Sequence, residues 1–208
     1  MISVKDQLRE LIPKYMAEWM VEGVLKFHDD HLEEILTAKG SSHNHQAWYG
    51  GYHDHVVQCL TIADDLWKGT AGYLECGVPG YAPRLVKNEL MFKFENVALV
   101  LYFHDIEKIF KYGGRRSIYD EKVLTNKDIW YYGILPEKYG IRFEHNELNA
   151  LEYIHGEGND YKKDERVMHP LAAFCHTVDV LSARVFHNAR WLAHSEEEAT
   201  QMAAKRGR

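Results

Sequence analysis

Histidines and aspartates in this sequence follow strongly apolar segments, where an ionisable side chain is costly. In the run 96–105, seven apolar residues lead directly into His104 and Asp105. An ionised carboxylate at the end of a buried helix costs several kcal/mol unless a cation or a close partner compensates it. The ordinary alternative is that Asp105 caps the next helical turn beside a hydrogen-bonded core histidine. The dyad is therefore a candidate metal site that other residues must support.

Two other segments place ionisable groups against apolar helical patterns. Asp179 falls on the apolar face predicted for residues 169–193, although a solvent-exposed face is the ordinary explanation. His53 and His55 follow a glycine turn at 50–51 and open the next helix. Because residues two apart cannot share a helix face, one of these histidines is expected to point inward. The alternative is a pair of solvent-exposed histidines near a helix start.

Taken together, these histidines and aspartates indicate a metal site more specifically than any one of them does alone. Their nitrogen and oxygen ligand atoms, with a position left for water, suit a divalent metal such as Mn, Fe, Co, Ni, Zn or Mg. His145 and His155 open and close one predicted helix, so about 15 Å along the axis separates them. They are not expected to bind one ion together. One would be a ligand and the other a substrate contact, unless both are ordinary surface residues.

The composition limits the class of protein. Of 208 residues, 46% are hydrophobic and 27% charged, which is typical of a soluble globular chain. No stretch approaches the roughly 18 consecutive apolar residues of a membrane span. The net charge of −6 argues against a general binder of long nucleic acid. The scattered Cys59, Cys76 and Cys175, and an N-terminus unlike a secretory signal, predict a cytoplasmic protein without disulfides.

Helical periodicity dominates the chain and predicts an all-α, single-domain bundle. One short strand at most is expected, at residues 129–132, where aromatic residues follow one another. Loops are predicted at 41–51, 69–83 and around 113–116. The predicted helices are 4–12, which ends at Pro13, then 14–38, 53–67, 85–104, 120–128, 144–155 and 169–193.

These residues resemble the HD superfamily of metal-dependent phosphohydrolases. His-Asp-Ile-Glu-Lys at 104–108 resembles the family's His-Asp-Ile-Gly-Lys, with Glu107 in place of a small residue. Residues 45–55 and 170–184 resemble two blocks of HD-type 3′→5′ exoribonucleases. The similar blocks are scattered over residues 41–190. The resemblance implies a helical bundle of the HD type with a metal in its centre, held by His55, His104, Asp105 and Asp179.

The resemblance also implies a domain plan and a second metal site. The catalytic core would span 41–193, with N-terminal helices at 1–40 packing on it and a charged, frayed tail at 194–208. Relatives with two metals carry two further histidines, the second often in His-His-Gly, whereas this sequence has one histidine in Ile-His-Gly at 154–156. One metal is therefore expected. A second metal, held partly by His145 or His155, stays open.

By the same resemblance, a metal-activated water would attack phosphorus. Asp105 would be catalytic as well as a ligand, and Glu107 or His145 would manage the proton. As an aromatic residue Trp48 could stack on a base, although aromatic residues beside a glycine turn more often serve packing. The expected phosphate contacts are Lys108, Lys111, Arg115, Arg116 and His155.

The predicted function is hydrolysis of a phosphomonoester or a triphosphate in a small phosphorylated substrate, a nucleotide as first choice. The alternative is a phosphodiesterase or nuclease acting on short or single-stranded RNA or DNA, or on cyclic nucleotides. A diiron HD oxygenase and a non-catalytic HD binding module rank lower. The exoribonucleases that it resembles carry an OB-type domain, for which this sequence has no strand pattern. No membrane partner is expected, and a homo-oligomer stays open.

Overall fold

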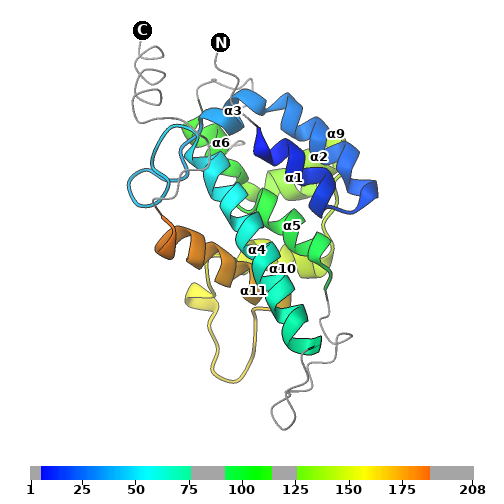
Figure 1. Ribbon diagram of the computed structural model, residues 1–208, viewed down its shortest axis with the longest axis vertical. Coiled ribbons are helices and arrows are strands. Elements are labelled where there is room, and N and C mark those ends of the chain that lie inside the picture. Colours follow the sequence, from blue (N-terminus) through cyan, green and yellow to red (C-terminus); the bar gives the residue numbers. More distant parts are fainter. Residues whose placement is uncertain (1–5, 76–91, 114–125, 188–208) are drawn as a thin grey trace.

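Helices form all the regular structure that the computed structural model describes (Figure 1). The described residues are 6–75, 92–113 and 126–187. The predicted all-α class is confirmed within them, since they contain no strand. Other predictions lie outside the described residues, namely those for 85–91, 114–125, 188–193 and the tail 194–208. The domain plan itself stays a prediction.

Three helices form the N-terminal part: α1 (Gln7–Tyr15), α2 (Glu18–Asp30) and α3 (Leu32–Thr37). The carboxylate of Asp6 begins α1 by accepting a hydrogen bond of 3.2 Å from a backbone N–H of the first turn. The predicted end of α1 at Pro13 is wrong, because the helix continues to Tyr15. Tyr15 is buried, so its packing holds the last residues of the helix in place.

Helix α4 (Gly51–Glu75) is longer than predicted. A loop was expected from residue 69 onward because of its glycines, but the helix runs through Gly69 to residue 75. A glycine costs a helix only about 1 kcal/mol, so a long helix tolerates it. The next helices are α5 (Phe94–Phe103) and α6 (Ile106–Tyr112).

The short strand that the sequence left open at residues 129–132 does not form. These residues belong to a continuous helical stretch of three parts, α8 (Lys127–Ile129), the π-helical turn η1 (Trp130–Ile134) and α9 (Leu135–Tyr139). Trp130 is fully buried and stacks on Phe110 with ring centroids 4.7 Å apart. Aromatic residues favour strands only when they face a sheet, and here tertiary packing overrides that preference.

The C-terminal part contains α10 (His145–Tyr153), the short 3₁₀ helix η2 (Gly158–Asp160), α11 (Pro170–Val180) and the π-helical turn η3 (Leu181–Val185). Proline at the first position of α11 suits a helix start, because that position needs no N–H. Within the described part of the helix predicted at 169–193, residues 170–185 are helical, and the last turn is wider than an α-helix.

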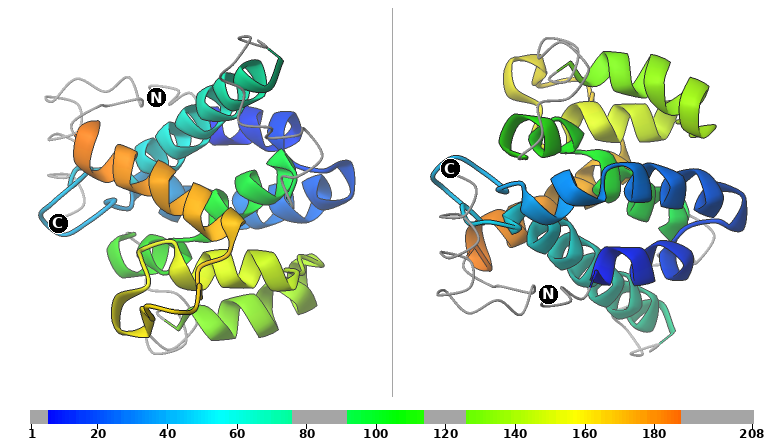
Figure 2. Two further views of the ribbon diagram at one scale, coloured as in Figure 1. Left: turned by 90° about the horizontal axis from the view of Figure 1, so that it is seen from below. Right: turned by 90° about the horizontal axis from the view of Figure 1, so that it is seen from above.

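Helix α5 lies in the middle of the bundle. It contacts α4, α10, α11 and α1, and Figure 2 shows these helices on different sides of it. All seven residues from 97 to 103 are at most 1% exposed. A helix that is apolar all round must be buried all round, so the sequence of α5 dictates its central place. This delivers His104 and Asp105 into the interior.

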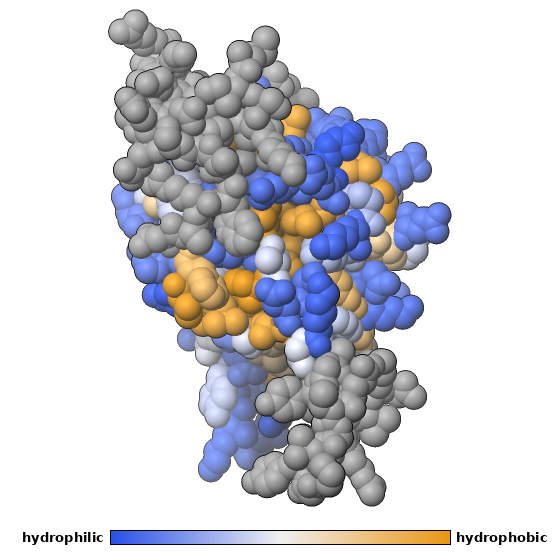
Figure 3. Space-filling model, viewed as in Figure 1, coloured by the Kyte–Doolittle hydropathy of each residue, from blue (hydrophilic) through white to orange (hydrophobic). Residues whose placement is uncertain are grey.

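The surface is mixed in character. Figure 3 shows polar and apolar side chains intermixed on one face, with an apolar area over α11. In that part of the chain Val180, Val185 and Phe186 are exposed. Among the described helices, none combines the length and apolarity that crossing a membrane requires.

Candidate metal centre

Four side chains from distant parts of the chain meet inside the bundle. His55 begins the second turn of α4, His104 and Asp105 connect α5 to α6, and Asp179 lies in the last turn of α11. Three of them are 0% exposed and Asp179 is 8% exposed. The structure thus brings together the four residues that the sequence and the resemblance indicated. Asp179 does not lie on a solvent-exposed helix face.

Five separations between ligand atoms match those of a small metal site. Nε2 of His55 lies 3.1 Å from Nε2 of His104 and 3.2 Å from Oδ1 of Asp179. Oδ2 of Asp105 lies 3.5 Å from Nε2 of His55 and 3.2 Å from Nε2 of His104. Oδ1 of Asp179 lies 3.7 Å from Nε2 of His104. Tetrahedral ligands about 2.1 Å from a metal are roughly 3.4 Å apart, so His55, His104 and Asp105 could hold one divalent cation. Asp179 belongs to two overlapping groups that could also hold a metal, one with His55 and Cys59 and the other with His104 and His155.

The tautomer of His55 is set by a hydrogen-bond chain. The amide of Gln58 donates its N–H to the carbonyl of Phe186 (3.3 Å), and its oxygen accepts from the hydroxyl of Ser182 (2.6 Å). Since the proton of Ser182 is used there, its oxygen accepts from Nδ1 of His55 (2.9 Å). Gln46 donates a further hydrogen bond to the oxygen of Gln58 (3.0 Å). Nε2 of His55 is left as a lone pair, which a metal ligand needs.

His104 and Asp105 are arranged in the same sense. Nδ1 of His104 donates to the carbonyl of Leu101 (2.8 Å), which leaves its Nε2 as a lone pair. Asp105 precedes α6, but its carboxylate makes no capping hydrogen bond to that helix. Its buried Oδ1 has no hydrogen-bond partner among the described residues. The alternative in which Asp105 only caps the next turn therefore fails.

The cluster needs one more positive charge. Lys108 lies 2.5 Å from Asp105 and balances one of the two carboxylates. Burial alone lowers the pKa of His104, but Asp105 and Asp179 outweigh burial and raise that pKa to about 10. Burial lowers the pKa of His55 to about 4. Without a metal, a proton on His104 therefore supplies the missing charge, and a metal ion would replace it.

Cys59 is close to the cluster but is not aligned as a ligand. It is buried one turn after His55, and its sulfur lies 3.9 Å from Nδ1 and 3.8 Å from Nε2 of that ring. A sulfur nearly equidistant from both nitrogens lies outside the direction of the Nε2 lone pair. Burial also raises the pKa of the Cys59 thiol well above its usual value, which disfavours the thiolate that binds metals.

The π-helical turn η3 sets what surrounds Asp179. A π-helical turn adds a residue to the helix register, and such turns are frequent at functional sites. Ser182, in this turn, is fully buried and reaches His55. Ala183 and Arg184 instead line a pocket together with Asp179. One turn of chain therefore serves both the cluster and the pocket.

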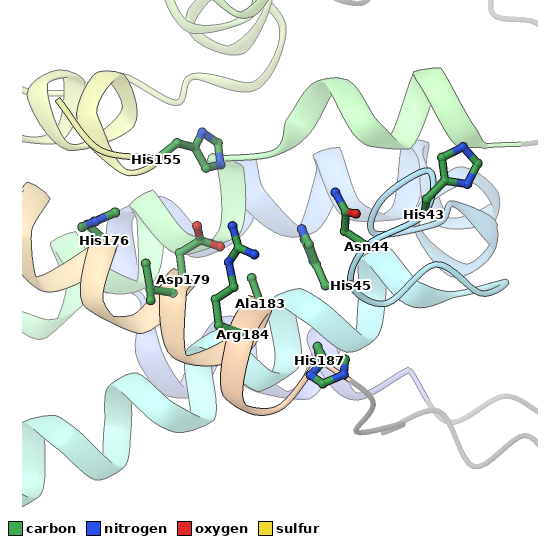
Figure 4. A pocket seen from close by; sticks show the side chains of 10 residues that line it. His43, Asn44, His45, His155, His176, Asp179, Ala183, Arg184 and His187 are labelled. Atoms are coloured by element: carbon green, nitrogen blue, oxygen red, sulfur yellow. The ribbon is translucent and has the colours of Figure 1, made fainter. Parts of the chain in front are cut away.

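The pocket has a volume of about 550 Å³, and Asp179 is the one residue of the four that lines it (Figure 4). Asp179 therefore belongs to both the cluster and the pocket. His155 also connects them, since it lines the pocket and its Nε2 lies 3.4 Å from Oδ1 of Asp105. The volume lies in the range of about 300–1,000 Å³ typical of small-molecule sites. The histidines that line it are His43, His45, His155, His176 and His187.

The residues predicted to contact phosphate are dispersed. Lys108 lies at the cluster and is 17% exposed. Lys111 lies over the ring of Tyr112, 5.4 Å from its centroid. Arg115 and Arg116 lie outside the described residues. Of the predicted cations, the structure places only Lys108 at the cluster within the part of the chain that it describes.

Of the other predicted site residues, some lie at the cluster and others have partners elsewhere. The ammonium group of Lys127 lies 3.6 Å from Oε2 of Glu107, so this carboxylate has a cation of its own. His145 is exposed at the start of α10, with its ring 5.3 Å from that of His169. The indole of Trp48 donates a hydrogen bond of 2.8 Å to Asp54. The predicted helix 144–155 ends earlier, at Tyr153, and His155, in the turn that follows α10, reaches the cluster.

Sequence reasoning missed several residues that build the site. The buried chain Gln46–Gln58–Ser182 orients His55, and Arg184 and His176 line the pocket. His176 precedes Asp179 by three residues, a spacing that puts both on one helix face and could have indicated its role. The two glutamines carry no comparable pattern.

Comparisons of the chain with protein-family models, with curated proteins and with solved structures return no match. The site combines a buried set of imidazoles and carboxylates that could hold a metal ion with an adjoining pocket large enough for a small molecule.

Proposed function

We propose that this protein is a metal-dependent phosphohydrolase of the HD type that acts on nucleotides. The observation that carries the proposal is the 3.1 Å separation between Nε2 of His55 and Nε2 of His104, flanked by two buried carboxylates. Two lone pairs at that distance repel each other unless a proton or a metal ion lies between them. The resemblance of residues 104–108 to the HD motif supports the same interpretation.

His55, His104, Asp105 and Asp179 would hold the metal. When bound, a divalent metal supplies a Lewis acid for a phosphoryl oxygen and a water molecule of lowered pKa. Lys108 neutralises negative charge on the phosphoryl group, since its ammonium group lies at the cluster and is partly exposed.

Proton transfer to the leaving group is assigned to His155. Its side chain is 47% exposed, lines the pocket and lies 3.4 Å from Asp105, so it can reach both substrate and cluster. Glu107 and His145, the earlier candidates, face Lys127 and His169 instead.

The test is metal analysis followed by a substrate panel. We expect chelation to abolish phosphate release from nucleotides, and Mn²⁺, Co²⁺ or Ni²⁺ to restore it. Asp105→Asn should lower metal affinity and turnover at least about 100-fold while the far-UV spectrum is unchanged. Asp128→Asn, which removes an exposed carboxylate, is the matched control. Cleavage of oligonucleotides or cyclic nucleotides alone would favour the phosphodiesterase, and a protein that neither binds metal nor cleaves any substrate would refute the proposal.

A further inference from the structure

The pocket carries a positive charge that no described residue neutralises. Arg184 lines the pocket and makes no ion pair or hydrogen bond within the described parts of the chain. In Figure 4 its side chain extends from the last turn of the helix into the space bordered by the histidines. A guanidinium group in a pocket is suited to bind a phosphate or carboxylate through two parallel hydrogen bonds.

The position of Arg184 follows from the π-helical turn η3. Arg184 comes five residues after Asp179, which is the hydrogen-bonding interval of a π-helix. Both side chains therefore line the same pocket. An anion bound at Arg184 would lie next to the candidate metal centre but outside its ligand set.

The neighbouring histidines His45 and His176 suit a different ligand group from the one that suits Arg184. Nδ1 of His176 donates to the carbonyl of Ile154 (2.6 Å), and Nδ1 of His45 donates to the side-chain oxygen of Gln46 (2.7 Å). In both neutral rings Nε2 is then an acceptor, which suits a hydroxyl group rather than an anion. Burial lowers the pKa of His45, which favours this neutral form. Arg184 is thus the one permanent cation among the described residues that line the pocket.

The other cation near the pocket is Lys108, which is paired with Asp105. The ammonium group of Lys108 bonds to Asp105 at the cluster and does not line the pocket. With Lys108 and a metal serving the phosphoryl group that reacts, the charge of Arg184 is left for another group. We propose that Arg184 binds a second anionic group of the substrate, one that is not attacked. The substrate class is then a compound with at least two phosphate groups, such as a nucleoside di- or triphosphate; this step rests on the proposed function.

Binding to the metal-free protein tests the subsite without turnover. The probe is inorganic tripolyphosphate, titrated calorimetrically into the 208-residue chain in the presence of a chelator. Arg184→Gln should weaken binding at least about tenfold, the effect of losing one charge-assisted hydrogen bond, and Arg184→Lys should recover part of it. Arg142→Gln, which removes an exposed arginine outside the pocket, should bind like the wild type. Equal affinity of Arg184→Gln and wild type would overturn the proposal.

Turnover then tests which phosphate Arg184 holds. With nucleoside mono-, di- and triphosphates of one base, Arg184→Gln should lower kcat/KM for the di- and triphosphate at least about tenfold and that for the monophosphate less than about threefold. An equal loss on all three would overturn the proposal, because Arg184 would then contact the reacting phosphate. Absence of hydrolysis by the wild type on every substrate would refute the proposed function, and the tripolyphosphate titration would still decide whether Arg184 binds the anion.

Discussion

The hydroxyl of Ser182 accepts a hydrogen bond from Nδ1 of His55, a residue 127 positions earlier in the chain (2.9 Å). Both side chains are fully buried. Because the hydroxyl of Ser182 donates its own hydrogen bond to the side-chain oxygen of Gln58, the bond to His55 holds the imidazole in the tautomer whose Nε2 faces the carboxylates. The geometry of the cluster therefore depends on a residue that is not itself a ligand.

Replacing Ser182 by alanine should weaken metal binding without unfolding the protein. The ring of His55 loses its partner and samples the other tautomer, so we expect a loss of metal affinity of about 10- to 100-fold. Competition with a fluorescent chelator measures the affinity. The control is Thr177→Ala, which removes an exposed hydroxyl of α11 that bonds to the backbone of its own helix, and this variant should bind metal normally. Equal affinities for the two variants would contradict the assigned role of Ser182.

The stability of the metal-free protein should fall as the pH rises above about 6.5. Although burial opposes it, the two aspartates raise the pKa of His104 from 6.5 to about 10 on folding. A group whose pKa rises on folding stabilises the folded state fully below its unfolded value, and this contribution is lost as the pH approaches the folded value. We therefore expect the Tm with chelator present to decrease between about pH 7 and pH 9.

A saturating metal ion should remove this decrease, because the metal takes the place of the proton on His104. Thermal unfolding followed by circular dichroism, with and without Mn²⁺, compares the two forms. His104→Gln should also lose the decrease, since it has no group to deprotonate. Parallel curves for metal-free and metal-saturated wild type would show that His104 is not the titrating group.

Metal binding should release about one proton near pH 8. The metal needs the lone pair of His104, which is protonated in the metal-free protein at that pH. The apparent affinity should then rise about tenfold per pH unit. Calorimetric titration in two buffers of different ionisation enthalpy counts the proton. A heat that does not depend on the buffer would contradict the pKa assigned to His104.

Gly51 should be intolerant of a side chain. A Cβ there would lie 1.8 Å from the carbonyl oxygen of Gln46, whose side chain belongs to the hydrogen-bond chain behind His55. Gly51→Ala should therefore lower the free energy of unfolding by about 1–3 kcal/mol and reduce metal affinity as the loop shifts. Gly133→Ala is the control, because nothing lies within 4 Å of a Cβ at that position. Urea unfolding should show the control to be at least as stable as the wild type.

Local pattern was sufficient for the helices and for the ligand types. The apolar run before His104 predicted a buried helix, and residues 97–103 of α5 are buried. The prediction succeeds because the apolar residues of a helix determine which of its faces must be buried. Local sequence pattern failed where contacts with other helices determine the secondary structure. The aromatic residues at 129–132 have strand preference but pack as a helix against Phe110, and the glycines after residue 68 lie within a longer α4.

The sequence by itself determined that the chain is helical and that His104, Asp105 and Asp179 are ionisable residues in apolar segments, and it left open which of His53 and His55 points inward. Only the tertiary structure decided that the ligand atoms of these three residues and of His55 converge, that Asp105 is not used as a cap, and that His155 rather than His145 reaches them. It also decided which hydrogen bonds orient His55 and where Arg184 extends. The physical reason is range: periodicity and burial are properties of one helix, whereas a distance between ligands on α4, α5 and α11 depends on how all three pack.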